Sequence, residues 1–534
     1  MTASTLSRVR PSRIAALFWL VFIIRVSSLM YWQSPTVDEV THIPAGYIYW
    51  HWKDFYVNRE HPVLVKLVSA GGFALSYGET AWTKRLDSLQ TFFADYPTQK
   101  TLAGRWPMFI FSLSLLAVLQ ATLRRLFDRT TAALSTIALT LFPLLIAHSV
   151  FVHTDVAAAL FYLSAFSILA CWTAETRRVE RMEMQDGASL QHPPRLAWRW
   201  PALLGGVMAL GTLAKYSMML AVANSIIAIL FLAPKGRRWR SMAVFVASFT
   251  FIFMLLSWSG YAGLRGDFVE PHAEWVNWIP IPSYYKEGLF MLWRHNAEGH
   301  ENVFLMKTGF KGHVGYFPLA LLLKTPIPVL IGMAAGTFIV FYRRYPWRWI
   351  WLLFFTTYWT GALTSNLNLG ARHILPVLVL MWVPLAAAAQ AASLLKRWRA
   401  ASVALFAWLA VSSFAHWGSE LAYFNELVGS RNGWKYLGDS NVDWGQELGA
   451  LARFVQARSL TPLYQDLFTP FSLSMYGVDA ASLSDGIKGN GLRPGWYAIS
   501  AHRLATKQGS AYDYFRAAQP SESLGDSVYL YRVE

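Results

Sequence analysis

The chain has 534 residues, of which 54% are hydrophobic and only 15% are charged, and its net charge is +16. Soluble proteins carry roughly a quarter charged residues, so this composition excludes an ordinary soluble enzyme and indicates lipid as the solvent. The positive charge does not indicate nucleic acid, because Lys and Arg lie in short clusters between apolar segments. The single cysteine, Cys171, excludes an intrachain disulfide and a thiolate metal site.

The apolar segments predict an all-α polytopic membrane protein with about eleven spans, since a helix needs ~20 apolar residues to cross a bilayer. The first segment reads as a signal anchor, because it has the length of a span and no small-residue cleavage site follows it. The spans are expected at approximately 14–32, 102–123, 131–149, 156–174, 200–216, 217–233, 241–263, 316–342, 349–364, 373–394 and 400–415.

The basic clusters predict the orientation of these spans. If the N-terminus is cytoplasmic, every cluster falls on the cytoplasmic side, as the positive-inside rule requires. We therefore expect residues 416–534 to lie outside the cell or in the periplasm. The clusters include Arg8–Arg13, Arg124–Arg129, Arg177–Arg181, Lys235–Arg240, Arg343–Arg348 and Lys396–Arg399.

Three outer segments are long enough to carry function. Residues 33–101 are rich in aromatic residues, and their apolar stretch 63–77 is too short to span comfortably, which predicts an interfacial helix. Residues 264–315 form the second segment. Residues 416–534 contain frequent Gly, Pro and Asn residues, which are typical of turns. They also contain short segments of mixed apolar and polar residues at 495–500 and 527–532, and together these features predict a small soluble α+β domain.

Basic residues at the outer ends of spans are candidates for binding an anionic lipid headgroup. Arg25, Lys215, Lys324 and Arg372 all fall in the outer half of the membrane or at its outer edge. Charges at this depth are costly and are often functional, and a phosphate or diphosphate in the outer leaflet would suit them. Each is equally consistent with a side chain that snorkels or pairs with a nearby carboxylate.

Carboxylates and histidines gather on the same outer side. Asp38 and Glu39 follow the first span, where they can supply a base, a metal ligand or a helix cap. Asp155 lies in the shortest outer turn and can also serve that turn's own hydrogen bonds. Glu and His side chains could together bind a divalent metal ion, although no spacing in the sequence matches a metal motif. Glu60, His61 and His42 are candidates for contacts to the substrate or for ligands of such an ion, and His153, His313 and His373 are further outer histidines.

The outer C-terminal segment contains a polar cluster around one tryptophan. This pattern fits a loop that faces a sugar and runs into a helix, and it fits an Asx turn with a cap equally well. The candidate substrate contacts are Asp439, Asn441, Asp443, Trp444 and Gln446.

These motifs, in this order, resemble the polyprenyl-phosphate-sugar glycosyltransferases of the protein O-mannosyltransferase and aminoarabinose transferase superfamily, in a bacterial subgroup. Asp38-Glu39 resembles its acidic motif, and Asp155 matches its second acidic position. The segment from Glu60-His61-Pro62 to Lys66 resembles its loop before an interfacial helix, with Val63 and Val65 where Pro and Gly are common. Further similar motifs are Leu213-Ala-Lys215-Tyr216, Lys324-Thr-Pro326, Gly370-Ala-Arg372-His373 and Tyr423-Phe-Asn425-Glu426 with Asp439–Gln446.

The resemblance implies a GT-C membrane fold with a catalytic transmembrane domain at 1–415 and the outer domain at 416–534. It implies transfer of a sugar from a polyprenyl-phosphate donor to a hydroxyl of a glycan, lipid or protein, on the outer face of a bacterial inner membrane, with inversion at C1. Asp38 is the expected base, and Glu39 and Asp155 would position the acceptor or the base. Lys215, Arg372, Lys324 and Lys66 are the expected phosphate-binding residues.

Two other functions remain open from the sequence. A transporter or flippase for the same lipid would also need basic groups at membrane depth, but it would need neither an Asp-Glu pair at the membrane surface nor an outer domain. A scaffold without catalysis would use the outer domain to bind a glycan or a protein. The sequence does not identify the sugar or the acceptor.

Overall fold

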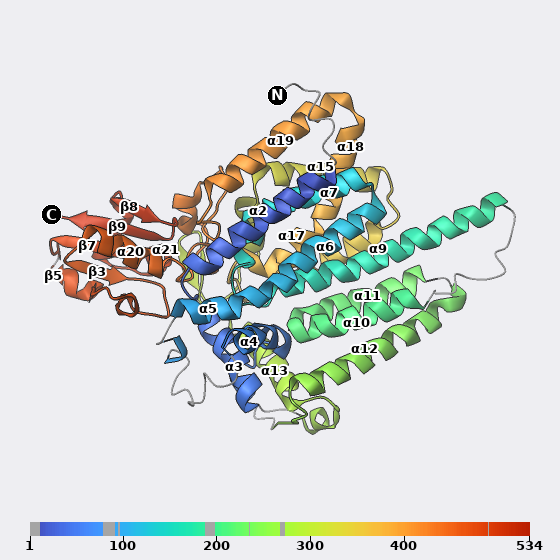
Figure 1. Ribbon diagram of the computed structural model, residues 1–534, viewed down its shortest axis with the longest axis horizontal. Coiled ribbons are helices and arrows are strands. Elements are labelled where there is room, and N and C mark those ends of the chain that lie inside the picture. Colours follow the sequence, from blue (N-terminus) through green and yellow to red (C-terminus); the bar gives the residue numbers. More distant parts are fainter. Residues whose placement is uncertain are drawn as a thin grey trace.

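The computed structural model describes residues 11–77, 91–93, 97–186, 198–233, 235–266, 273–489 and 491–534. Helices form the body of the molecule, and a small sheet lies at its C-terminal end (Figure 1). The helices of the body are α2 (Pro11–Trp32), α3 (Glu39–Trp52), α4 (Val63–Tyr77), α5 (Pro97–Arg105), α6 (Phe109–Leu126), α7 (Arg129–Thr140), α8 (Pro143–His148), α9 (Asp155–Asp186), α10 (Arg199–Ala214), α11 (Met219–Leu232), α12 (Arg238–Gly260), α13 (Ser283–Glu298), α14 (Tyr316–Lys324), α15 (Ile327–Tyr342), α16 (Arg348–Leu363), α17 (Leu375–Leu380), α18 (Trp382–Leu394) and α19 (Lys396–Ala415).

The predicted helical membrane architecture is confirmed, while the number of spans stays a prediction. Among the described residues, the structure has 5 helices long and apolar enough to cross a membrane, or up to 7 if each of two bent pairs is one span. One predicted span is broken in the structure, because segment 131–149 is divided into α7 and α8 before Pro143. Three others are short: α10 and α16 have 16 residues each, and α11 has 14 residues.

The predicted span 316–342 is not one straight helix. It is bent by 113° between α14 and α15. The bend follows from Thr325-Pro326, because proline lacks the amide hydrogen that would continue the helix and excludes the helical conformation from the residue before it. Thr325 is accordingly extended, and the break turns the end of α14 toward the outer domain.

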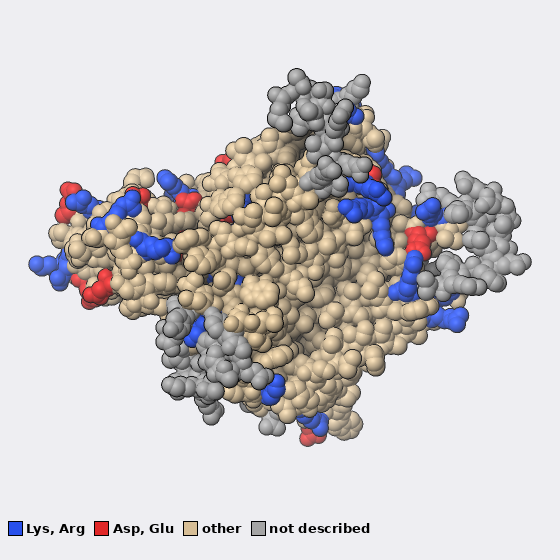
Figure 2. Space-filling view, viewed as in Figure 1, with Lys and Arg blue, Asp and Glu red and all other residues tan. Residues whose placement is uncertain are grey.

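The body is built around α9, where 89% of the apolar window is buried inside the protein, against 17% for α12 at the periphery. Helix α9 packs against α6, α10 and α17, while α2 packs against α7 and α15 against α18. In the view of Figure 2, the middle of the body is almost free of charged side chains, and Lys and Arg gather at the end opposite the C-terminal domain. This distribution is the one expected for a membrane protein with a basic cytoplasmic face.

Helices α3 and α4 form a close pair that holds the first outer loop in place. The pair requires glycine at position 46, because a β-carbon there would lie 2.2 Å from the carbonyl oxygen of Lys66. Helix α4 matches the predicted apolar stretch 63–77, and it packs in turn on α5. Residues 78–90 and 94–96 of this predicted outer segment lie outside the described residues.

The outer segments contain the strands. Strands β1 (Asn302–Phe304) and β2 (Lys307–Gly309) form a hairpin after α13. The C-terminal part has a five-stranded sheet in the order β4-β3-β7-β9-β8, with β3 parallel to β4 and β7, and with β9 antiparallel to β7 and β8. Its elements are α20 (Leu448–Arg458), β3 (Leu463–Asp466), β4 (Ala481–Ser482), β5 (Ile487–Lys488), β6 (Gly491–Leu492), β7 (Gly495–Ser500), α21 (Ala501–Thr506), α22 (Ser510–Ala517), β8 (Glu522–Leu524) and β9 (Val528–Val533).

This sheet confirms the predicted small α+β character of the C-terminal segment. The short mixed segments 495–500 and 527–532 correspond closely to the paired strands β7 and β9. Tyr497 lies opposite Tyr531 in the register, and both are buried because each strand has four consecutive buried residues and is therefore covered on both faces.

Candidate functional site

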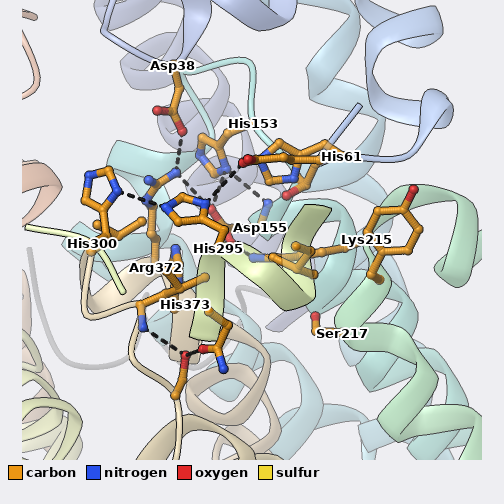
Figure 3. A pocket seen from close by; sticks show the side chains of 18 of the residues that line it. Asp38, His61, His153, Asp155, Lys215, Ser217, His295, His300, Arg372 and His373 are labelled. Carbon is orange, nitrogen blue, oxygen red and sulfur yellow. Dashed lines mark hydrogen bonds and ion pairs between the residues drawn. The ribbon is translucent and has the colours of Figure 1, made fainter. Parts of the chain in front are cut away.

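A cavity of about 600 Å³ lies where the ends of several apolar helices meet the C-terminal segment 416–534, which is predicted to lie on the outer side and is called the outer domain below. Helix termini supply its charged residues: Asp38 directly precedes α3, Asp155 is the first residue of α9, and Lys215 directly follows α10. Arg372 lies in the short helix η7 (Ala371–Ile374), just before α17. The side chains of these residues point toward one another in the cavity (Figure 3).

Two carboxylates and two cations form one network in this cavity. Arg372 Nη1 donates to Asp38 Oδ2 at 2.7 Å and lies 3.5 Å from Asp155 Oδ2. Lys215 Nζ donates to Asp155 Oδ1. The Asp155 side chain is only 2% exposed, whereas that of Asp38 is 26% exposed. A molecule in the cavity therefore reaches Asp38 more easily than Asp155.

The outer domain forms one wall of this cavity through the segment that follows η9 (Asp439–Asn441). The guanidinium of Arg372 lies 4.2 Å from the centroid of the Trp444 ring, and its Nε donates to Ser440 Oγ at 3.2 Å. Asn441 Oδ1 accepts a hydrogen bond from the amide of Ala371 at 2.9 Å. These contacts with the outer domain thus fix the position of the Arg372 side chain in the cavity.

Of the predicted sugar contacts in this segment, Asp439 and Trp444 line the cavity. The other three are buried and bond within the protein: Asn441 Nδ2 donates to the Tyr316 hydroxyl, Asp443 Oδ1 accepts from the amide of Gly445, and Gln446 Oε1 accepts from that of Trp444. These three shape the loop and do not lie on the cavity wall.

Burial changes the acidity of the carboxyl groups in this segment. It raises the pKa of Asp439 to about 6 and that of Asp443 to about 7, because a buried carboxylate loses its hydration. Asp439 faces the cavity, so its charge there depends on pH in the neutral range.

Glu39 does not face the cavity and instead forms a buried ion pair. Arg105 donates from Nε to Glu39 Oε1 and from Nη2 to Glu39 Oε2, each at 2.7 Å, and both side chains are fully buried. Glu39 Oε1 also accepts from the amide of Val152, which lies shortly before Asp155. The pair therefore ties the segment of Asp38 to the turn that carries Asp155.

Lys66 and Lys324, two of the four predicted phosphate ligands, are buried and are absent from the lining of this cavity. Lys66 Nζ donates to the carbonyl oxygens of Asn58 and His61 and to the Tyr49 hydroxyl. Lys324 Nζ donates to the carbonyl oxygens of Leu421 and Asn441, at 2.7 and 2.6 Å. Both ammonium groups are therefore bound to backbone carbonyl oxygens of segments near the cavity, and these contacts stabilise the backbone there.

Arg25, which the sequence also singled out, pairs with a carboxylate, as one of the sequence interpretations expected. Its Nε donates to Glu420 Oε1 at 2.5 Å, and its Nη1 donates to Ser413 Oγ at 2.8 Å. Both partners of the ion pair are 1% exposed.

Histidines line a second side of the cavity. The rings of His42 and His61 lie 4.9 Å apart, and burial lowers the pKa of both well below the usual histidine value. His295 Nδ1 is 3.2 Å from Glu60 Oε2, and its Nε2 is 3.0 Å from His300 Nδ1. The hydrogen bond with Glu60 raises the pKa of His295.

Sequence reasoning did not select His295 and His300 as site residues. The only signal for them was the concentration of histidines on the outer side of the membrane. A possible metal site was expected from Glu60, His61 and His42, but among the described residues no group of three or more His, Cys, Asp or Glu side chains is arranged to hold a metal ion.

Comparison with known proteins gives a family match in the N-terminal part of the chain. Residues 15–272 match the family described as dolichyl-phosphate-mannose-protein mannosyltransferase. The match confirms the resemblance expected from the motifs, and it includes Asp38, Asp155 and Lys215 but ends before Arg372. No curated protein matches the chain.

Several solved structures resemble this chain at low identity. ArnT from Cupriavidus metallidurans in the apo state is 14% identical with a TM-score of 0.49, and the match covers 97% of both chains. ArnT bound to undecaprenyl phosphate gives 14% identity and a TM-score of 0.46, over 96% of this chain and 97% of that chain. The Archaeoglobus fulgidus oligosaccharyltransferase in the apo form is 11% identical with a TM-score of 0.49, over 83% of this chain and 58% of that chain.

Proposed function

We propose that this chain, a member of the protein O-mannosyltransferase and aminoarabinose transferase superfamily, transfers a sugar from a polyprenyl-phosphate donor to an acceptor hydroxyl on the outer face of the membrane. The observation that carries this proposal is the cavity in which the partly exposed Asp38 lies beside Lys215 and Arg372, at the ends of apolar helices. Such a position lets a donor approach from the lipid and an acceptor approach from water.

The reaction is a single displacement at C1 of the donor sugar. Asp38 accepts the proton of the acceptor hydroxyl while the oxygen of that hydroxyl forms a bond to C1. The bond between C1 and the phosphate oxygen breaks, and its electron pair leaves with the lipid phosphate. Because attack and departure occur on opposite faces of C1, the configuration at C1 is inverted.

Lys215 and Arg372 stabilise the charge of the departing phosphate. Both cations line the cavity, and Asp155 holds both of them: it accepts from Lys215 and lies 3.5 Å from Arg372. Cations fixed before the reaction cost no reorganisation when the charge develops. Asp155 is therefore a positioning residue for the two cations, and its burial supports Asp38 as the base.

Glu39, Lys66 and Lys324 act through the backbone around the cavity. Glu39 and Arg105 hold the loop that presents Asp38, and the two lysines bind carbonyl oxygens of neighbouring segments. The positive charge gathered opposite the outer domain supports a cytoplasmic N-terminus. A bacterial inner membrane is proposed from the motif resemblance.

The test uses purified full-length protein in lipid vesicles with a labelled polyprenyl-phosphate sugar. Label on an acceptor glycan, lipid or protein, lost in the Asp38→Asn variant, is the expected result. Movement of the labelled lipid across the bilayer without transfer would make the protein a flippase, and binding alone would make it a scaffold. Mass spectrometry of glycolipids and glycoproteins from cells without this protein would then identify the sugar and the acceptor.

A further inference from the structure

A second, smaller cavity lies where the end of the first span meets the outer domain. Its volume is about 120 Å³. Tyr31, Trp32 and Gln33 contribute from the end of α2, and Arg453 and Tyr476 contribute from the outer domain. A single water needs about 10–15 Å³ of such space, so this cavity has room for one small ring.

Aromatic rings lie at this second cavity and are open to solvent. Tyr31 is 53% exposed and Trp32 is 54% exposed, and their rings meet edge to face with centroids 5.0 Å apart. Exposed indole and phenol rings offer a flat apolar face beside a polar group. The C–H face of a pyranose ring packs against a surface of this kind.

The polar groups of the second cavity include a buried acceptor and an unpaired cation. Gln33 is 8% exposed, and its Oε1 accepts no hydrogen bond from any described residue. Arg453 has its guanidinium carbon 5.0 Å from the Trp32 ring centroid, and it forms no ion pair with a described carboxylate. Tyr476 donates its hydroxyl hydrogen to Ser34 Oγ at 2.9 Å, so the lone pairs of its oxygen remain available as acceptors.

We propose that this second cavity binds a pyranose ring that carries an anionic substituent. The ring packs against the exposed aromatic surface of Tyr31 and Trp32, the Gln33 side chain turns its amide toward a ring hydroxyl, and the anionic group binds Arg453. A buried acceptor without a partner costs free energy, which a hydroxyl donor would recover. Pockets that combine aromatic walls with a few convergent polar groups are typical ligand sites.

This proposal rests on the proposed function and adds an acceptor class to it. Ser34 lines the second cavity and Asp38 lines the first, and a chain of four residues spans at most ~14 Å. One acidic oligosaccharide can therefore occupy the second cavity while it presents a hydroxyl to Asp38. The second cavity would select an acidic glycan as the acceptor.

The test measures binding on the full-length protein in detergent micelles by saturation-transfer NMR titration. The probes are glucuronic acid, glucose and glycerol 3-phosphate. We expect glucuronic acid to bind more tightly than glucose, and Trp32→Ala to weaken its binding at least ~10-fold. Arg453→Gln should remove the preference for glucuronic acid over glucose, because it keeps a polar side chain but removes the charge.

Matched controls come from exposed residues elsewhere in the outer part. Trp278→Ala removes a tryptophan that is 85% exposed, and Arg458→Gln removes a cation of the same helix as Arg453. Neither control should change the binding of glucuronic acid. The Asp38→Asn variant should also bind it normally, so a failure of transfer and a failure of this second site are distinguished.

Three outcomes would overturn the proposal. The first is binding of glucuronic acid that does not depend on Trp32. The second is binding of glycerol 3-phosphate as tight as that of glucuronic acid, which would indicate a lipid headgroup site. Equal binding of glucose and glucuronic acid would overturn the role given to Arg453.

Discussion

Arg372 Nη1 donates to Asp38 Oδ2 at 2.7 Å and lies 3.5 Å from Asp155 Oδ2, so one guanidinium bridges carboxylates from two distant parts of the chain. An anionic phosphate entering the cavity would compete with Asp38 for this guanidinium. Since Asp155 and Lys215 also hold each other, Asp38 is the carboxylate that this competition releases. Donor binding would thereby free the proposed base.

The first prediction concerns Asp38. Asp38→Asn keeps the shape of the side chain and its hydrogen bond to Arg372 but removes the basic oxygen. We expect transfer to fall at least ~100-fold, the lower range for loss of a general base, with donor binding nearly intact. The measurement is single-turnover transfer beside a donor titration. If Asp155→Asn abolished transfer and Asp38→Asn did not, the base would be Asp155.

The second prediction concerns the two cations. Lys215→Ala and Arg372→Ala should leave the protein folded and inserted but reduce donor use on the order of 100-fold or more, because each removes a fixed donor to the leaving phosphate. Donor affinity and turnover are the measurements. Arg431→Ala is the control, since this arginine is 79% exposed in the outer part. Normal donor use by both cavity variants would contradict the phosphate role.

The third prediction separates Glu39 from Asp38. Glu39→Gln leaves the buried Arg105 without its counter-charge, and breaking one partner of a buried pair costs about 3–5 kcal/mol. We expect a clearly lower melting temperature by thermal denaturation in micelles. The control is Glu175→Gln, which opens a largely exposed pair with Arg199 and should have almost no effect. An unchanged melting temperature of Glu39→Gln would argue against this structural role.

The fourth prediction concerns the pH dependence of the outer domain. Burial raises the pKa of Glu447 to about 8 and that of Asp443 to about 7, both above the values of unfolded carboxyl groups. The folded state therefore binds more protons, and stability falls as pH rises through these values. Burial lowers the pKa of His502 to about 3 and also lowers that of His42 and His61, so the opposite contribution of these histidines is complete only about one pH unit above the unfolded value of about 6.5.

The clean window lies between about pH 7.5 and 8.5, above the titration of unfolded histidine and across the pKa of Glu447, and the melting temperature should decrease there with rising pH. Glu447→Gln should flatten this slope, because glutamine does not titrate. Ser510→Ala, at the start of α22, is a control that should keep the slope of the wild type. A melting temperature that rises through this window would contradict the prediction.

The fifth prediction concerns topology. Reporter fusions after Lys235, Arg344 and Arg399 should be cytoplasmic, and fusions after Glu287 and Gly495 should be external, because the basic clusters remain on the cytoplasmic side. A fusion after Thr83 should also be external and tests a part of the chain outside the described residues. An external position for Arg344 would reverse the orientation and remove the argument for an outer active face.

The sequence by itself predicted the helical membrane architecture, the small α+β C-terminal segment and the resemblance to the family, because apolar run length, residue composition and short motifs are local properties. It also predicted that Asp38, Asp155, Lys215 and Arg372 lie on one side of the membrane. It could not determine which of these side chains meet. Arg372 and Asp38 are separated by 334 positions, and only the tertiary packing that places η7 beside the start of α3 brings them together.

The tertiary structure also decided between neighbours that the sequence treated alike. Asp38 and Glu39 are adjacent, but successive residues at the start of a helix point in different directions, so Asp38 faces the cavity while Glu39 turns to Arg105. Lys324 and Arg372 looked equivalent as cations at the ends of spans. The 113° bend after Lys324 surrounds its ammonium group with carbonyl oxygens, whereas Arg372 is held at the cavity by Trp444 and Ser440. Side-chain direction and long-range packing, which no local pattern encodes, made these distinctions.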